Sequence, residues 1–379
     1  MDMNYHIFVA SAPGMEALTA QEMRTLEISA GHATQVEGGI EFTGNLPEIY
    51  RANLLLRTAG RVLVRLGKFH AAAFSELRKK GARLPWETYL QPGQPVALRA
   101  TCHRSRLYHS DAVVERLVGA IGDRLGTPPE LVTGDTEEME QPPQIIHARL
   151  VNNVCTISVD ASGAHLHRRG YRLATAKAPL RETLAAGLVL ASGWDGHAPL
   201  LDPFCGAGTI AIEAALWARN HAPGRERHFA FMDWPGFVAD MWETTLAAAQ
   251  AAEQPISGPL FASDRDAGAI RAAEANTARA SVTDSIAFTC QAVSAIAPPP
   301  GPGWIVTNPP YGVRVSANHD LRNLYAQFGH VLRARCSGWH VALLCSDSRL
   351  IQQTGLRLET THTWLNGGLR VHVAQGMVE

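Results

Sequence analysis

The stretch "PLLDPFCGAGTIAIEAALWARN" (residues 199–220) joins an apolar run to a helical pattern through two glycines. The apolar run up to Asp202 predicts a buried strand, and Gly206 and Gly208 allow the sharp turn that follows it. From Thr209 the pattern predicts a helix whose first backbone N–H groups are free to bind a ligand. Strands alternate with helices from here towards the C-terminus, which predicts a parallel α/β sheet.

The glycine turn alone leaves the kind of site open. With Ala211 it fits the G-x-G-x-x-A fingerprint of dinucleotide-binding folds, and it equally fits a tight turn without any ligand. Asp202 argues against a pyrophosphate, because a carboxylate at the strand end would repel phosphate groups. The same carboxylate suits a cationic ligand, such as a sulfonium compound that carries an α-amino group.

A second acidic turn follows the next predicted strand in "FASDRD" (residues 261–266). Asp264 ends that strand, where a carboxylate can accept two hydrogen bonds from a ribose diol. Asp266 is the alternative, although its position favours capping of the following helix. The separation from the glycines far exceeds the about 20 residues typical of such units. We therefore expect an insertion, for which "HAPGRERHFAFMDWPGFVADMW" (residues 221–242) is the candidate.

A third turn, in "IVTNPPYGVRV" (residues 305–315), places Asn308, Pro309 and Tyr311 at the end of a buried strand. An exocyclic amine is a poor nucleophile because its lone pair is delocalised. The Asn308 side-chain oxygen and the next backbone carbonyl can accept its two N–H groups and aim the lone pair at a methyl group. Tyr311 can stack on the base. The alternative is a proline-rich loop that merely ends the strand.

These motifs together resemble the class I S-adenosylmethionine-dependent methyltransferases, with "DPFCGAGT" as the cofactor loop and "TNPPYG" as the amine-methylating motif. The resemblance implies a Rossmann-like domain, catalysis by Asn308, Pro309 and Tyr311, and S-adenosyl-L-methionine as the cofactor. The implied cofactor contacts are Pro179, Leu180, Arg181, Asp202, Phe204, Gly206, Gly208, Thr209, Asp264 and Asn308. Gln291 departs from the family's usual aspartate, but its amide oxygen can still accept a hydrogen bond from the adenine amino group.

The whole chain resembles a narrower family, the THUMP-containing RNA guanine-N2 methyltransferases that act on large-subunit rRNA, and their tRNA-modifying relatives. "APGMEALTAQEM" and "RANLLLRTAGRVLVRL" are similar to the ferredoxin-like lead of that family, and "ATCHRSRLYHSDAVVERL" to its THUMP domain. The expected domains are a ferredoxin-like domain over residues 1–65, a THUMP domain over 66–165, and a linker with the methyltransferase domain over 166–379. The expected partner is RNA, with 23S rRNA favoured and tRNA as the alternative.

Two basic clusters with an interleaved aromatic residue are typical of RNA contact. The candidates in the first cluster are Arg99, His103, Arg104, Arg106 and Tyr108. The second cluster, "HLHRRGYR", holds Arg168, Arg169 and Arg172 where the two halves join, so it is placed either to touch RNA or to brace the domains. A third cluster, "RKKGAR" (residues 78–83), is expected to be a solvated helix end.

Bulk composition narrows the setting. The 379 residues are 46% hydrophobic and 18% charged, and the net charge of −1 means that RNA binding would depend on local patches. The six cysteines form no C-x-x-C pair, so we expect no structural zinc site. The N-terminus lacks a signal-peptide pattern, and no apolar run reaches the about 18 residues of a membrane helix, so we expect a cytoplasmic protein.

Four alternatives stay open from the residues alone. The N-P-P-Y turn can also hold an adenine N6 amine, in DNA or RNA, or a glutamine side chain of a release factor. A Rossmann oxidoreductase is disfavoured by Asp202 and by the N-P-P-Y turn. An RNA-binding protein without activity is disfavoured by the intact turn and by Asn308.

Overall fold

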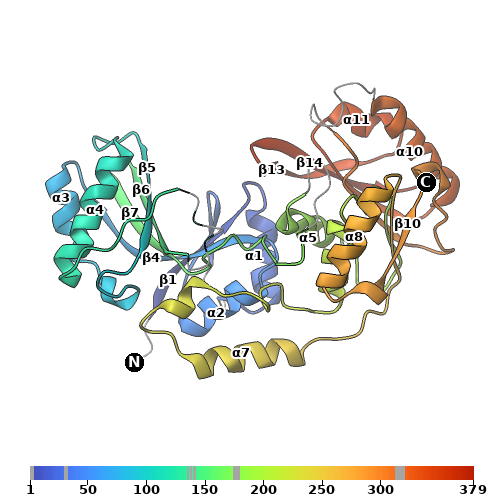
Figure 1. Ribbon diagram of the computed structural model, residues 1–379. Helices are drawn as coiled ribbons and strands as arrows, with labels where there is room; N and C mark the ends of the chain where they lie inside the picture. The colour runs from blue at the N-terminus through green and yellow to red at the C-terminus, as the bar shows by residue number, and fades with distance from the viewer. Residues whose placement is uncertain are drawn as a thin grey trace.

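Two seven-stranded sheets organise the chain, one in each lobe of Figure 1. The structure is a computed structural model that describes residues 4–29, 33–134, 136, 139, 142–173, 180–311 and 321–379. Within these residues no helix is both long and apolar enough to cross a membrane.

The N-terminal sheet is continuous across the first two expected domains. Its strands, in spatial order, are β2 (Thr34–Val36), β3 (Gly39–Gly44), β1 (Tyr5–Ser11), β4 (Ala59–His70), β7 (Val154–Asp160), β6 (Gln144–Val151) and β5 (Val96–His103). The long strand β4 pairs with β1 on one edge and with β7 on the other. The expected domain boundary at residue 65 stays a prediction, and it falls within this strand.

Helices cover only one face of this sheet. They are α1 (Glu16–Thr25), α2 (Leu46–Leu55), α3 (Phe74–Gly81) and α4 (Ser110–Leu125). Alternate strand residues such as Val62, Ile146 and Ile157 point into the same hydrophobic core as Tyr50 of α2 and Leu117 of α4. Because side chains alternate along a strand, the intervening residues occupy the opposite face.

The C-terminal sheet is doubly wound. Its strands, in spatial order, are β10 (Ile286–Cys290), β9 (Leu260–Asp264), β8 (Leu200–Asp202), β11 (Trp304–Thr307), β12 (His340–Cys345), β14 (Leu369–Met377) and β13 (Glu359–Asn366). The first five strands are parallel, and the final hairpin is antiparallel to β12. This arrangement confirms the expected Rossmann-like domain.

Both faces of the C-terminal sheet are buried, since adjacent strand residues enter different cores. One core holds Leu200 and Val306, the other Leu201 and Ile305. The first core is covered by α5 (Glu182–Ala191), α6 (Thr209–Ala218) and α8 (Ala267–Arg279), and the second by α10 (Leu321–Arg335) and α11 (Ser348–Gln353). Fully apolar strands are typical of a parallel sheet that is covered on both sides.

The segment between α6 and β9 belongs by sequence to the C-terminal lobe but packs on the N-terminal one. It contains α7 (Ala239–Ala251), which runs below α2 in Figure 1. The Phe231 ring stacks on Tyr50 of α2 at 4.5 Å, and Trp242 meets the same tyrosine edge-on at 5.9 Å. The expected insertion is part of the C-terminal lobe by sequence, and these aromatic contacts attach it to the N-terminal lobe.

A buried ion pair also crosses the junction between the lobes. Arg169 Nε lies 2.9 Å from Oε1 of Glu213 on α6, and both side chains are almost fully buried. The Tyr171 hydroxyl donates to the same Glu213 oxygen at 2.9 Å. Arg169 also donates to the main-chain oxygen of Arg57 at 2.7 Å, while the Arg57 guanidinium donates to the His221 carbonyl at 2.6 Å.

Candidate active site

The site forms where the strand order of the C-terminal sheet reverses. The chain moves outward from β8 to β9 and β10, then returns to the other side of β8 with β11. In such sheets ligands bind beyond the carboxyl ends of the strands at this switch point. Asp202, Asp264 and Asn308 lie at or directly after the carboxyl ends of β8, β9 and β11.

Asp202 is fully buried and only partly hydrogen-bonded. Its Oδ1 accepts from the Thr307 hydroxyl at 2.6 Å and from the Phe204 N–H at 3.2 Å. Its Oδ2 has no partner among the described residues. Burial, with a smaller contribution from the charge of Asp264, raises the pKa of Asp202 to about 7. A buried oxygen without a donor is costly, so a ligand with a cationic donor would stabilise this site.

The glycine turn adopts the left-handed conformation that its sequence predicts. Gly206 has φ +53° and Gly208 has φ +83°, so larger residues would be strained at both positions. A Cβ atom at Gly208 would also lie 3.0 Å from Cβ of Ala273 in α8. Thr209 then begins α6, and its helix N-terminus points free N–H groups at the switch point.

Asp264 and Asp266 have different roles in this structure. Asp264 Oδ2 accepts from the Gly206 N–H at 3.0 Å, which fastens the glycine turn to β9. Asp266 Oδ1 accepts from the Gly268 and Ala269 N–H groups at 2.7 and 3.3 Å and so caps α8. The Gln291 N–H donates to the Asp264 carbonyl at 2.9 Å, so the end of β10 lies beside this acidic turn.

Asn308 directly follows β11, and its Oδ1 is buried without a partner among the described residues. Pro309 is buried, and the Pro310 carbonyl accepts from the Tyr325 hydroxyl at 3.3 Å. Burial raises the pKa of the Tyr311 phenol, and its hydroxyl is hydrogen-bonded to the side chain of Asn366, which ends β13. The acceptor needed to hold an amine is thus present, and no group in the described part of the chain occupies it.

The remaining expected cofactor contacts lie around α5 and α6. Leu180 is buried, Arg181 is the exposed residue before α5, and the Phe204 ring packs edge-on against Phe328. Pro179 lies outside the described residues. Burial, with smaller contributions from the charges of His165, Arg181, Arg172 and Arg168, lowers the pKa of His167 to about 3.

The RNA candidates divide into exposed and buried groups. Those in the first cluster are exposed, and Tyr108 is 68% exposed: Arg99, His103, Arg104, Arg106 and Tyr108. In the second cluster Arg168 is exposed, whereas Arg172 is 3.2 Å from Glu182 and Arg169 is held by Glu213. The bracing role is therefore favoured for Arg169, because its charge is already neutralised in a buried pair.

Two residues that the sequence did not single out complete the site. Thr307 bonds Asp202 across β8 and β11, and Asn366 bonds Tyr311 from the final hairpin. Thr307 precedes the N-P-P-Y turn directly, so its place at the strand end was a usable signal. Asn366 stands before Gly367 in a turn-forming pair, and only the pairing of β13 with β14, and of β14 with β12, brings it to Tyr311.

S-adenosylmethionine fits this donor and acceptor set. The unpartnered Asp202 oxygen suits its ammonium group, the two lone pairs of each Asp264 oxygen leave room for ribose hydroxyls, and the glycine turn admits a close approach. A pyrophosphate is anionic and would need positively charged groups at this position. A dinucleotide therefore does not fit beside the buried carboxylate of Asp202, whose Oδ2 has no partner among the described residues.

Cofactor affinity is expected to rise about tenfold between pH 6 and pH 8, because the free Asp202 titrates near pH 7 and only its ionised form attracts the cation. Isothermal calorimetry across this range measures the effect. Asp202→Asn should weaken binding and flatten the profile, while any titration of the ligand itself appears in both proteins. Parallel profiles for the two proteins would exclude Asp202 as the ammonium partner.

Asp264→Ala is expected to weaken cofactor binding by about 1.5–3 kcal/mol, the scale of a lost hydrogen bond to a charged group. Asp266→Ala is the matched control. It should lower the free energy of unfolding by about 0.5–2 kcal/mol through loss of the helix cap, with little change in cofactor affinity. The reverse result would move the ribose contact to Asp266.

Models of known families match most of the chain. Residues 169–372 match the sequence model of a family described as an RMKL-like methyltransferase domain. Residues 6–63 match a domain described as the RlmL ferredoxin-like domain, and residues 71–160 match the THUMP domain.

Curated relatives span the chain from end to end. A putative RNA methyltransferase of Synechocystis, slr0064, is 34% identical over 96% of this chain and 94% of its own length. The ribosomal RNA large subunit methyltransferase K/L of Syntrophotalea carbinolica is also 34% identical, over 97% of this chain but 53% of its own length. The chain thus spans about half the length of the K/L relatives that it matches.

Solved structures share the fold along the whole chain. SMU.472, described as a putative methyltransferase complexed with SAH, is 26% identical with a TM-score of 0.89 over 100% of this chain and 99% of its own. A protein of Listeria monocytogenes, described as a predicted N6-adenine-specific DNA methylase, is 31% identical with a TM-score of 0.87 over 100% of this chain and 97% of its own.

Proposed function

The chain belongs to the RMKL-like methyltransferase family, and on this basis we propose that it methylates the exocyclic N2 amine of a guanine in RNA. The cofactor is S-adenosylmethionine, which supplies an electrophilic methyl group on a sulfonium centre. The proposal depends on two buried oxygens at the ends of neighbouring strands, Asp202 Oδ2 and Asn308 Oδ1, which have no partner among the described residues.

Asn308 and Pro309 would act by positioning. The Asn308 Oδ1 and the Pro309 carbonyl accept the two N–H groups of the guanine amine, so its lone pair points at the methyl group. The N–C bond forms as the C–S bond breaks and its electron pair stays on sulfur. The surplus proton then leaves the methylated nitrogen for solvent. Tyr311, held by Asn366, would stack on the extruded base.

We infer that the substrate is 23S rRNA, with tRNA as the alternative. The relatives named large subunit rRNA methyltransferase support rRNA, and the THUMP and ferredoxin-like matches support an RNA substrate of either kind. A cytoplasmic location follows from that substrate. We likewise propose the catalytic residues, guanine as the methylated base and the RNA contacts.

The test is methyl transfer from labelled S-adenosylmethionine to protein-free 23S rRNA, 16S rRNA and bulk tRNA, followed by nucleoside analysis. N2-methylguanosine in 23S rRNA is the expected product. The same nucleoside in tRNA would keep the chemistry and change the substrate. N6-methyladenosine would overturn the choice of base, in the direction suggested by the description of the Listeria relative. No transfer to any RNA would overturn the proposal.

A further inference from the structure

Part of the N-terminal sheet is polar and basic on the face that carries none of the described helices. Side chains on this face form two rows that cross four neighbouring strands, as the strand registers show. From β4 through β7 and β6 to β5, the first row is Arg65, Ser158, His147 and Arg99, and the second is Lys68, Thr156, Arg149 and Thr101. Cations alternate with hydroxyl groups in the second row, and each row extends over about 14 Å, given the usual spacing of strands.

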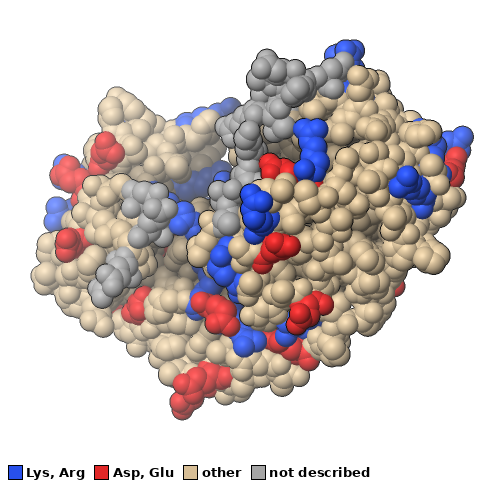
Figure 2. All heavy atoms as spheres, turned by 45° about the vertical axis from the view of Figure 1, so that its right-hand side comes forward, with Lys and Arg blue, Asp and Glu red and all other residues tan. Residues whose placement is uncertain are grey.

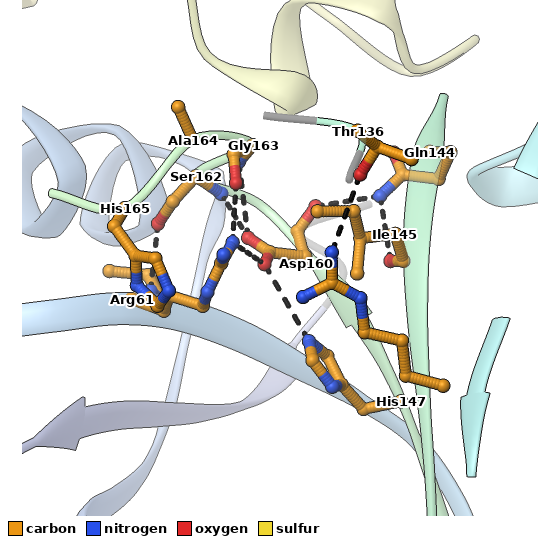
Figure 3. Close-up of polar contacts among 12 residues, drawn as sticks. Arg61, Thr136, Gln144, Ile145, His147, Asp160, Ser162, Gly163, Ala164 and His165 are labelled. Carbon is orange, nitrogen blue, oxygen red and sulfur yellow. Dashed lines mark hydrogen bonds and ion pairs between the residues drawn. The ribbon is translucent and has the colours of Figure 1, made fainter. Parts of the chain in front are cut away.

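The two described carboxylates on this face, Asp160 and Glu41, already have cationic partners. Asp160 is fully buried, and Figure 3 shows Arg61 and His147 converging on it, with Arg61 Nη1 at 2.5 Å from Oδ2. The N–H groups of Ser162 and Gly163 also donate to Asp160 Oδ1. A buried acid with this many donors does not attract further cations, so Asp160 does not compensate the charges of Lys68 and Arg149.

Glu41 is likewise engaged, since it accepts from Arg65 Nε and Nη2 at 3.2 and 3.0 Å. Lys68 and Arg149 are exposed and have no carboxylate partner within the described part of the chain. The Arg65 guanidinium has its pKa lowered by burial, raised by Glu41, and lowered again by the nearby charge of Arg149. The face thus holds like charges close together, which favours an anionic partner.

We propose that these two rows bind the sugar-phosphate backbone of the substrate RNA, an inference that rests on the proposed function. Arginine and lysine beside threonine and serine hydroxyls are the side chains that contact phosphate oxygens. Figure 2 shows Lys and Arg side chains in the hollow between the two lobes. The described residues of the two rows are all polar, so an apolar protein surface or a membrane has little to bury there.

A short chain of contacts fixes this face relative to the catalytic turn. Strand β1 pairs with β4 in the same sheet, and the turn after β1 reaches the C-terminal lobe. There the Pro13 carbonyl accepts from the Leu365 N–H at 3.1 Å. The next residue, Asn366, bonds Tyr311. RNA bound to the rows would therefore be held at a fixed distance from the N-P-P-Y turn, with the contacts giving position rather than sequence choice.

The experiment is RNA binding to the double variant Lys68→Ala/Arg149→Ala, with protein-free 23S rRNA as the probe and salt varied. Loss of two phosphate contacts should lower affinity about tenfold near 0.15 M salt and reduce the slope of log K against log salt by about 1.4. The loss of affinity should appear as a higher KM for RNA. The kcat and the cofactor affinity should stay unchanged, since neither residue is near the reacting atoms.

Two variants serve as controls. Lys79→Ala/Arg83→Ala removes the same charge from exposed residues in and just after α3, on the helix-covered side, and should change neither affinity nor slope. Lys68→Arg/Arg149→Lys keeps the charge and should retain the wild-type slope. Wild-type binding by the alanine variant, or an equal loss in the Lys79/Arg83 control, would overturn the inference. Because binding is measured without turnover, a wild-type protein that methylates no RNA would contradict the proposed function separately.

Discussion

Asn308→Ala is expected to lower the rate of methyl transfer by at least about 10²–10³-fold, the scale seen when one preorganised polar group is removed from an active site. The Asn308 Oδ1 is buried and has no partner among the described residues, so its use is reserved for a substrate group. Cofactor affinity should stay nearly unchanged, because Asp202, Asp264 and the glycine turn do not depend on the asparagine side chain. Single-turnover kinetics with saturating RNA measures the rate.

The control for this prediction is Asn308→Asp, which keeps an acceptor oxygen at the same place and should retain more activity than the alanine variant. A wild-type rate in the alanine variant would exclude Asn308 from amine positioning. A fall in cofactor affinity that matches the fall in rate would instead make Asn308 a cofactor contact.

The positions of the main site residues could be predicted because they follow consecutive parallel strands. Once the sequence predicts a parallel sheet, the residues after each strand must meet at one edge, so Asp202, Asp264 and Asn308 converge without knowledge of packing. The capping role of Asp266 was predictable for the same local reason, and the structure confirms it. The burial of Asp202 and the missing partner of its Oδ2 depend on packing and could not be predicted.

Strand β6 is not among the strands that were predicted from the sequence above. The signal was present, since "QIIHARLV" is followed by Asn152-Asn153 and then by β7. Both asparagines have positive φ, 51° and 64°, as in a two-residue hairpin turn. Because this hairpin was not predicted, the basic rows on the open face of the sheet were not predicted either.

The junction between the lobes could not be predicted, because its contacts join residues far apart in sequence. Tyr50 meets Phe231 and Trp242, and Arg169 meets Glu213, without any local pattern that specifies the pairing. A fragment that begins at residue 166 would expose these aromatic side chains. Part of the surface of the expected domain of residues 166–379 is thus buried against the N-terminal lobe.

Glu213→Ala is expected to lower the free energy of unfolding by about 3–5 kcal/mol, the cost of leaving a buried charge without its partner. Arg169 would keep its charge in a site where its side chain is 2% exposed, and the Tyr171 hydroxyl would lose its acceptor as well. Because Glu213 lies on α6, directly after the glycine turn, cofactor affinity should fall with stability. Urea unfolding followed by tryptophan fluorescence measures the first effect, and calorimetry the second.

Two further variants separate the loss of the Glu213 charge from the loss of its packing contacts. Glu274→Ala removes an exposed glutamate from α8 and should change stability by less than about 0.5 kcal/mol. The double variant Glu213→Leu/Arg169→Leu removes both charges and should be more stable than Glu213→Ala alone, since apolar replacements of a buried pair are often tolerated. If the double variant were the less stable of the two, the junction would depend on the main-chain hydrogen bond from Arg169 to Arg57, and the pair with Glu213 would be secondary.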